Sequence, residues 1–168
     1  MPPEPRKHAI VYYSRDGHTH RLARQLADTL EADLFRIVTS RYSSNVLGYL
    51  HAGFDSLTGW LPSISPIPDL SGYASVSLGA PIWTSYPGTP LRTYLATRPK
   101  LPDIVGMFAT SGGNSAQDKA FSIACGTMDR PFVATFSVPN SLDQAAADMR
   151  VTDYCNALVT AVGTDLST

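Results

Sequence analysis

Apolar residues show two different spacing patterns, which alternate along the chain. Short runs rich in β-branched and aromatic residues are typical of strands buried on both faces of a parallel sheet. We expect five such strands, at 8–13, 33–39, 75–80, 104–110 and 132–137. The segments between them carry apolar residues at helical spacing, which predicts helices with one buried stripe. These helices are expected at about 17–30, 45–61, 89–97, 116–124 and 141–162.

This alternation in a chain of 168 residues implies an open parallel sheet with helices on both faces. The length suits one domain with a single core, which we place at 7–168 behind a flexible tail at 1–6. The sequence PSISPIP at 62–68 is expected to run extended over the surface, because its prolines cannot continue a helix. Apolar side chains of the preceding helix, 45–61, are expected to pack against the rest of the protein. A lid or a partner surface is the alternative.

Composition and charge limit the classes of protein to which this chain can belong. Apolar residues make up 43% of the chain and charged residues 16%, which is typical of a globular protein. The 13 basic and 14 acidic residues give a formal net charge of −1 without a basic cluster, so nucleic acid is not an expected partner. No apolar run reaches the ~20 residues that span a bilayer, so no membrane is expected. Two isolated cysteines and the lack of a signal-peptide core favour the cytoplasm.

Three loops are expected at the carboxyl ends of strands, where open parallel sheets bind their ligands. They read SRDGHT at 14–19, GAPIWTSYPGT at 79–89 and TSGGNS at 110–115. Other nucleotide and nucleophile motifs are absent, namely G-x-x-x-x-G-K-[ST], G-x-G-x-x-G and G-x-S-x-G. The sequence therefore does not favour an NTPase, a dinucleotide-binding fold or an α/β-hydrolase.

The first loop has the features of a phosphate site. The helix that follows Gly17 is expected to point its unpaired N–H groups and its positive dipole end at a ligand. Ser14 and Thr19 add hydroxyl donors, and Gly17 lets the backbone approach an anion closely. The alternative is that Ser14, Asp16 and Thr19 only cap the helix.

The three loops together resemble those of the flavodoxin family. Residues 10–26 resemble the signature [LIV]-[LIVFY]-[FY]-x-[ST]-x-x-[AGC]-x-T-x-x-x-A-x-x-[LIV]. Its specified positions are filled by Ile10, Val11, Tyr12, Ser14, Gly17, Thr19, Ala23 and Leu26. LGAPIWTSYPGTPLRTYL at 78–95 resembles the family's flavin loop, and MFATSGGNS at 107–115 resembles its third loop. The resemblance implies a flavodoxin-like three-layer α/β sandwich, with a five-stranded parallel sheet in the order 2-1-3-4-5 and FMN at the strand ends.

The resemblance also implies which residues bind FMN. They are Ser14, Arg15, Asp16, Gly17, His18, Thr19, Pro81, Ile82, Trp83, Thr84, Thr110, Ser111, Gly112 and Gly113. Trp83 is expected to stack on the isoalloxazine ring, and the backbone of 110–113 to face its pyrimidine edge. Tyr49 and Trp60 are expected to be packing residues, with a place at the flavin pocket as the alternative.

Asp16 departs from the family pattern, which usually has a hydroxyl residue at this position. A carboxylate facing a phosphate dianion would repel it, so we expect Asp16 to point outward or to pair with Arg15, His18 or His20. If it faces inward instead, the affinity for FMN should be weak.

The expected function is that of an FMN-binding redox protein. An oxidoreductase that passes electrons from NAD(P)H or a redox partner to a small acceptor such as a quinone is favoured, because the near-neutral charge is unlike that of acidic electron shuttles. The alternatives are a non-catalytic electron-transfer flavodoxin and an FMN-free interaction module. No side chain is an evident general acid or base, so no catalytic residue is named. No metal site is expected, since His18 and His20 lack a third ligand. A homo-oligomer is compatible with this function.

Overall fold

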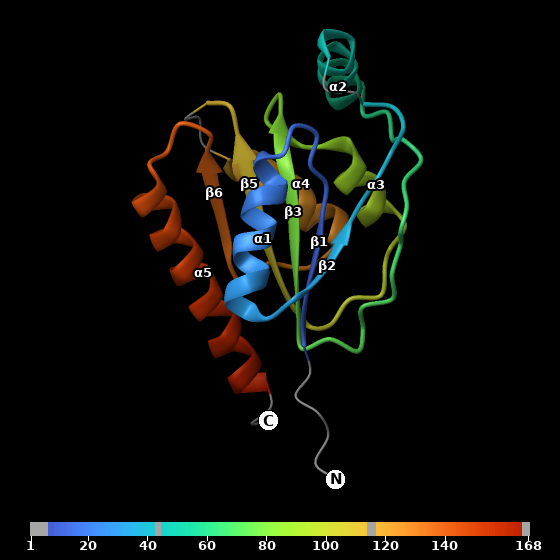
Figure 1. Cartoon of the computed structure of the whole chain (residues 1–168). Helices are drawn as coiled ribbons and strands as arrows, with labels where there is room; N and C mark the ends of the chain where they lie inside the picture. Colours follow the sequence, from blue (N-terminus) through green and yellow to red (C-terminus); the bar gives the residue numbers. More distant parts are fainter. Residues whose placement is uncertain (1–6, 43–44, 114–116, 166–168) are drawn as a thin grey trace.

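The computed structural model describes residues 7–42, 45–113 and 117–165 (Figure 1). The predicted tail at 1–6 and the end of the third predicted loop, 114–115, lie outside the described residues. The described part is a parallel sheet between two layers of helices, which is the predicted three-layer α/β sandwich.

The parallel strands of the sheet have the predicted order. Their bounds are β1 (His8–Tyr12), β2 (Asp33–Arg36), β3 (Ser75–Trp83), β5 (Ile104–Ser111) and β6 (Thr135–Pro139). Within the described residues the order is β2-β1-β3-β5-β6, which corresponds to 2-1-3-4-5 when only parallel strands are counted. In the centre, Ile10 of β1 pairs with Leu34 of β2 and with Ser77 of β3. The chain order therefore reverses beside β1, which is the position where such sheets bind ligands.

Helices cover both faces of the sheet. Their bounds are α1 (His18–Leu30), α2 (Val46–Thr58), α3 (Thr89–Ala96), α4 (Asp118–Met128) and α5 (Gln144–Asp165). Figure 1 shows α1 and α5 on one face, and α3 and α4 on the other. α2 belongs to neither layer and stands beyond the carboxyl ends of the strands. In the described part of the chain, none of the helices has both the length and the apolar character needed to cross a bilayer.

β1 shows why the sheet is buried on both faces. Ala9, Val11 and Tyr13 point into the core under α3 and α4. Ile10 and Tyr12 point the other way, into the core under α1 and α5. Because both faces are covered, the strand reads as a continuous apolar run and not as an alternation of apolar and polar residues.

Two glycines let aromatic rings approach the sheet backbone on the α5 side. A Cβ atom at Gly79 of β3 would overlap the ring of Phe108, and one at Gly106 of β5 would overlap the phenol of Tyr154. Tyr154 uses this space to donate a hydrogen bond from its hydroxyl to Ser77 Oγ at 2.9 Å. The glycines are therefore required by packing and not by backbone conformation.

The structure corrects the end of the third predicted strand. β3 continues to Trp83, beyond the predicted end at Ala80, and a short strand β4 (Tyr86–Pro87) then pairs with it in the antiparallel sense. The turn between them places Thr84 and Ser85 at φ of 51° and 69°. Turns of this kind favour glycine and asparagine, so the sequence Thr-Ser gave no signal for a hairpin.

Two further strand boundaries differ from the prediction. β2 ends at Arg36, before the predicted 39, although the next N–H still donates to Tyr12 O at 2.8 Å. β6 spans Thr135–Pro139, where 132–137 was predicted. Residues 62–68 contain no helix, as predicted from their prolines.

The expectation that the helix at 45–61 packs through its apolar side chains is wrong. Its apolar residues are exposed, namely Val46, Leu47, Tyr49, Leu50, Phe54, Leu57, Trp60 and Leu61. The residues that α2 buries are small or polar: Gly48, Ala52, Asp55 and Ser56. The helix exists as predicted, but its apolar face points away from the core.

The packing of Gly79 can be tested by unfolding. Gly79→Ala is expected to lower the free energy of unfolding by about 1–3 kcal/mol, because the new methyl group must displace the fully buried ring of Phe108. Gly126→Ala is the matched control, since Gly126 lies in α4 with no atom near its missing Cβ. It is expected to raise the free energy of unfolding by up to about 1 kcal/mol. Urea unfolding curves that coincide for the two variants would contradict this assignment.

Candidate functional site

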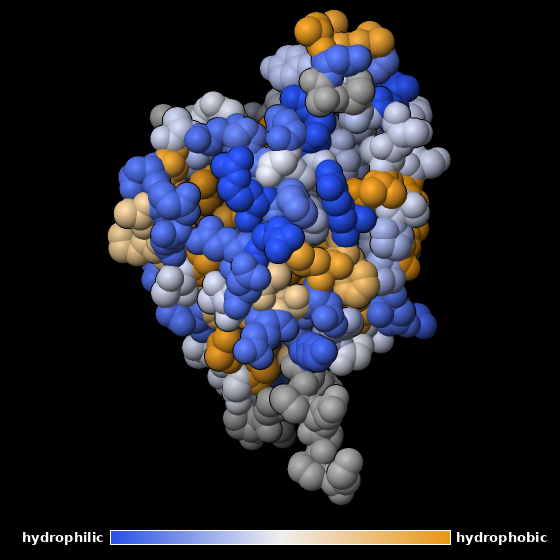
Figure 2. Space-filling view, in the orientation of Figure 1, coloured by the Kyte–Doolittle hydropathy of each residue, from blue (hydrophilic) through white to orange (hydrophobic). Residues whose placement is uncertain are grey.

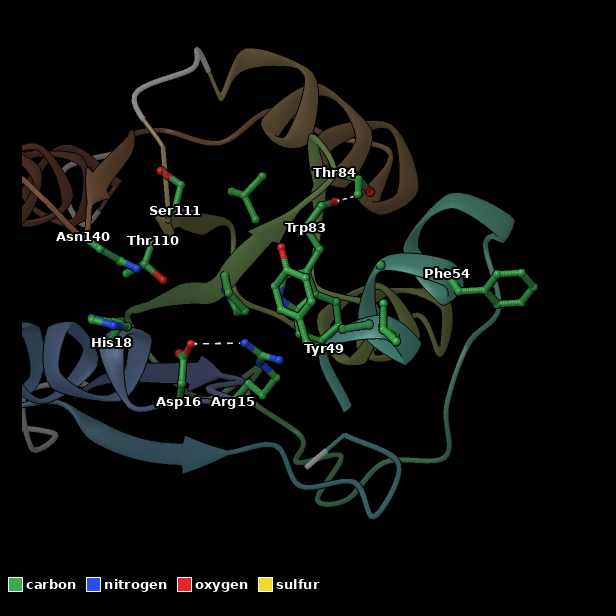
Figure 3. A pocket seen from close by; sticks show the side chains of 16 residues that line it. Arg15, Asp16, His18, Tyr49, Phe54, Trp83, Thr84, Thr110, Ser111 and Asn140 are labelled. Carbon is green, nitrogen blue, oxygen red and sulfur yellow. Dashed lines mark hydrogen bonds and ion pairs between the residues drawn. The ribbon is translucent and has the colours of Figure 1, made fainter. Parts of the chain in front are cut away.

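A cavity of about 550 Å³ lies at the carboxyl ends of β1, β3 and β5, bordered on its outer side by α2 (Figure 3). Its size is within the range of small-molecule and cofactor sites. All three predicted loops contribute to its lining, through Arg15, Asp16, His18, Pro81, Ile82, Trp83, Thr84, Thr110, Ser111 and Gly112. Ten of the fourteen predicted residues therefore line one cavity, and Ser14, Gly17, Thr19 and Gly113 do not.

The first loop leaves the start of α1 open toward this cavity. Gly17 is the N-cap residue, at φ 97°, and its N–H donates to Ser14 Oγ at 3.1 Å. Because Gly17 has no side chain, no N-cap side chain bonds to the first turn of α1. The next residue, His18, begins the helix and lines the cavity. The positive end of α1 thus lies at the cavity rim, where it favours an anion.

Thr19 and Ser14 support the loop from beneath and do not line the cavity. Thr19 is buried, and its hydroxyl shares a hydrogen bond of 2.8 Å with the hydroxyl of Thr110 in β5. Ser14 is also buried, under Gly17. Gly113 lies outside the lining as well, and its carbonyl accepts a hydrogen bond from Ser111 Oγ at 2.8 Å. These contacts fix the shape of the first and third loops.

Arg15 and Asp16 form an ion pair at the edge of the cavity, with Nη2 and Oδ2 3.4 Å apart (Figure 3). Of the expected alternatives for Asp16, the structure shows the pair with Arg15; the Asp16 side chain is 46% exposed and also lines the cavity. Nε and Nη1 of Arg15 are buried without a hydrogen-bond partner among the described residues. The Tyr49 ring lies over the guanidinium, 5.2 Å from its carbon. Two buried donors of Arg15 next to the cavity thus lack the hydrogen-bond partners that buried donors normally have.

Trp83 forms the opposite wall and is held by aromatic contacts. Its ring meets Tyr42 edge-on at 5.0 Å between centroids, and Tyr13 at 5.8 Å. Such edge-to-face pairs fix ring orientation. Burial raises the pKa of Tyr13 to about 12, so this neighbour stays protonated at neutral pH.

The hairpin that carries Trp83 is strained and is held by α2. Thr84 is β-branched yet lies in the left-handed region, which costs conformational energy. Its hydroxyl lies 3.0 Å from Ser56 Oγ, and Ser56 Oγ donates to the Trp83 carbonyl at 2.7 Å. The wall of the cavity therefore depends on the inner face of α2.

α2 is in turn held by a buried carboxylate. Asp55 is almost fully buried and accepts hydrogen bonds from Arg41 Nε at 2.5 Å, Arg41 Nη2 at 2.9 Å and the Tyr42 hydroxyl at 2.8 Å. The hydrogen bonds from Arg41 hold the pKa of Asp55 below its usual value. The Tyr42 hydroxyl also lies 2.5 Å from Thr89 Oγ1 at the start of α3. This network joins α2 to the body of the protein.

Part of the cavity lining was not predicted from the sequence. Five of the missed residues come from α2, namely Tyr49, Leu50, Ala52, Gly53 and Phe54, and Asn140 follows β6. Tyr49 was assigned to packing, with a pocket position as the alternative that the structure supports. Asn140 could have been found, because it follows a parallel strand and so lies at the same sheet edge as the other loops. Figure 3 shows the Phe54 ring pointing away from the cavity.

Comparison with known proteins identifies the fold. No protein-family model and no curated protein matches the sequence. A flavoprotein from Lactobacillus acidophilus NCFM, solved in complex with FMN, matches with a TM-score of 0.71 and 21% identity, over 89% of this chain and 98% of its own. A WrbA-like flavodoxin from Agrobacterium tumefaciens matches with a TM-score of 0.63 and 14% identity, over 93% and 97%. The fold is flavodoxin-like.

The same fold occurs as part of a larger protein. Rubredoxin oxygen:oxidoreductase from Desulfovibrio gigas matches over 96% of this chain but only 37% of its own length, with a TM-score of 0.64 and 17% identity. In the flavodoxin-like fold, as in other open α/β sheets, the ligand site is expected at the carboxyl ends of the strands. The cavity beside Arg15 and Trp83 lies at this position. In the described part of the chain, no group of three or more His, Cys, Asp or Glu side chains is placed to hold a metal ion.

The role of Asp55 predicts a local change in stability. Asp55→Asn is expected to speed amide exchange in α2 at least about tenfold, because a neutral amide cannot replace the charge-assisted bonds from Arg41. Hydrogen exchange followed by mass spectrometry checks this. Asp69→Asn is the control, since Asp69 pairs with Lys100 at the surface, away from α2. Equal α2 exchange in both variants would contradict the anchoring role.

The contact between Asp55 and Arg41 also makes the stability of α2 depend on pH. Because the folded-state pKa of Asp55 is lowered, its contribution is fully present above the ordinary carboxyl pKa and is lost as pH falls through the folded value. In the unmodified protein, the protection of α2 amides from hydrogen exchange should therefore fall in acid, relative to the amides of α3. In Asp55→Asn the same protection should change less with pH.

Proposed function

We propose that the cavity binds FMN and that the protein is an FMN-dependent oxidoreductase, which passes electrons from NAD(P)H or a redox partner to a small acceptor such as a quinone. The observation that carries the proposal is Arg15, whose side chain lines a cavity of cofactor size and whose Nε and Nη1 are buried without a hydrogen-bond partner in the described part of the chain. The open start of α1 and the flat ring of Trp83 border the same cavity. A ligand with an anionic group and an aromatic ring system fits these features.

The phosphate of FMN would be held by the first loop. The helix start at Gly17 and His18 offers backbone N–H groups and a positive dipole end. Arg15 adds a full positive charge and also neutralises Asp16, which would otherwise repel the phosphate. The exposed position of Asp16 lets its carboxylate stay in water while Arg15 remains beside the cavity.

The ring system would be held by the second and third loops. Trp83, which meets Tyr13 and Tyr42 at interplanar angles of 86° and 73°, would present its flat ring for stacking. Thr110, Ser111 and Gly112 line the cavity at the end of β5, where their backbone would face the polar edge of the ring. When bound, FMN supplies the hydride and electron transfer, so the chain itself needs to bind, orient and tune it.

An enzyme is favoured over a pure electron shuttle by the surface charge and by α2. Shuttles dock on partners through charge complementarity, whereas this chain has a formal net charge of −1. α2 also gives the cavity a side wall that could shape a pocket for a small acceptor. A non-catalytic electron-transfer protein is the alternative. An FMN-free interaction module is the third candidate, because a carboxylate lines the cavity at Asp16.

Flavin titration tests the proposal. FMN is expected to bind more tightly than riboflavin, and Asp16→Asn should raise the affinity for FMN on the order of tenfold by removing a negative charge beside the phosphate. Its affinity for riboflavin should not change. Asp28→Asn removes the same charge from the exposed side of α1 and serves as the control. Quenching of flavin fluorescence measures each affinity.

The outcomes separate the candidate functions. Equal affinities for FMN and riboflavin would contradict a phosphate site at the start of α1. If neither flavin binds, the interaction module is favoured. If FMN binds, anaerobic addition of NADH or NADPH to the loaded protein distinguishes the rest: bleaching of the flavin, reversed by a quinone, supports the oxidoreductase. A flavin that neither reductant bleaches excludes NAD(P)H as the electron donor and leaves a redox partner, which favours the electron-transfer protein.

A further inference from the structure

α2 turns its apolar face to solvent and its polar face to the protein. Figure 2 shows apolar side chains gathered on the end of the molecule where α2 lies. Leu57 is 67% exposed and Phe54 65%, while Asp55 and Ser56 between them are almost fully buried. A single exposed leucine is ordinary, but a whole apolar helix face indicates a surface that is covered in the functional state.

The spacing of this face is that of a helix-packing seam. Leu47, Leu50, Phe54 and Leu57 follow one another at intervals of three, four and three residues. This is the a and d pattern by which one helix packs along another. We call these four residues the α2 seam. A helix on the partner would fit this spacing.

The area of the face is enough for a stable interface. The seam is flanked by four more exposed apolar side chains, Val46, Tyr49, Trp60 and Leu61. Eight large side chains that are each about half exposed offer on the order of 800 Å² in total, which equals one side of a standard protein interface. This end of the molecule thus exposes enough apolar surface for one side of an interface, with Tyr49 over Arg15 and Trp60 over Arg41 at its edges.

The lack of charge on the exposed face of α2 limits which partners can cover it. Residues 46–58 contain no Lys or Arg, and their one acidic residue, Asp55, is buried against Arg41. A helix that lies on a lipid surface relies on basic side chains, and a partner of opposite charge needs a charge to recognise. A second copy can pack on this face without repulsion, because a two-fold axis brings no like charges together there.

We propose that the α2 seam packs against the α2 seam of a second copy of this chain, in a two-fold symmetric dimer. The interface is continuous with the cavity, since Leu50 belongs to the seam and lines the cavity, as does the neighbouring Tyr49. The second copy therefore covers the open side of the cavity next to α2. This dimer does not depend on FMN, so its test stands apart from that of the proposed function.

Sedimentation equilibrium of the full chain tests the dimer. The unmodified protein is expected to have twice the chain mass of 18.1 kDa in the absence of added flavin. Leu57→Glu places a charge in the seam without touching the cavity lining, and should raise the dimer Kd at least about a hundredfold. Met149→Glu is the matched control, because Met149 lies on α5 with a similar exposure of 64%. It should leave the dimer intact.

Each other result overturns the proposal. A monomer at every concentration tested would show that a second copy does not cover α2, and binding of that monomer to anionic lipid vesicles would assign the face to a membrane. Leu57→Glu that remains dimeric would place the interface elsewhere, as would equal dissociation by Met149→Glu. Far-ultraviolet circular dichroism of both variants confirms that neither substitution acts by unfolding the chain.

Discussion

The buried carboxylate of Asp55 holds together the part of the molecule on which the site depends. It accepts hydrogen bonds from Arg41 and Tyr42, and through Tyr42 it connects to the start of α3. Without these bonds α2 would have less to hold it, because its large apolar residues are exposed and Ala52 alone of its apolar side chains packs into the core. A charge at this depth is costly unless it is fully paired, so the pairing of Asp55 holds α2 in this position.

The consequences of this anchor reach the cavity through a chain of contacts. α2 supplies Ser56, whose hydroxyl bonds to the Trp83 carbonyl and meets the strained Thr84. Strained backbone is retained where the surroundings hold it, and here they orient the aromatic wall of the cavity. The same helix presents Tyr49 over the guanidinium of Arg15. The position of α2 therefore determines both the orientation of the Trp83 ring and the cover that Tyr49 forms over Arg15.

The strand order and the three loops could be predicted because parallel sheets follow strict rules. Buried strands read as apolar runs, their order follows from the resemblance to flavodoxins, and their carboxyl ends meet at one edge. The pairing of Asp16 with Arg15 followed from elementary electrostatics. The prediction that the apolar face of α2 points into the core was wrong. Helical periodicity shows that one face is apolar, but it does not show whether the core or another molecule covers that face.

The remaining misses have equally local causes. The β3–β4 hairpin turns through Thr84 and Ser85, which tertiary contacts hold in a conformation that their side chains disfavour. Asp55 reads as a surface residue in the sequence, since nothing nearby in the chain shows that Arg41 reaches it. Both misses arise from contacts with distant residues, which local patterns cannot contain.

The central claim is that the start of α1 holds the phosphate of FMN while Trp83 holds its ring. The most direct test is a set of amide and indole NMR spectra of the labelled protein, with FMN and then with riboflavin. The account predicts that the amides of Gly17 and His18 shift strongly with FMN and weakly with riboflavin, and that the Trp83 indole shifts with both. Unchanged amides at 17–18 in the presence of bound FMN would contradict it.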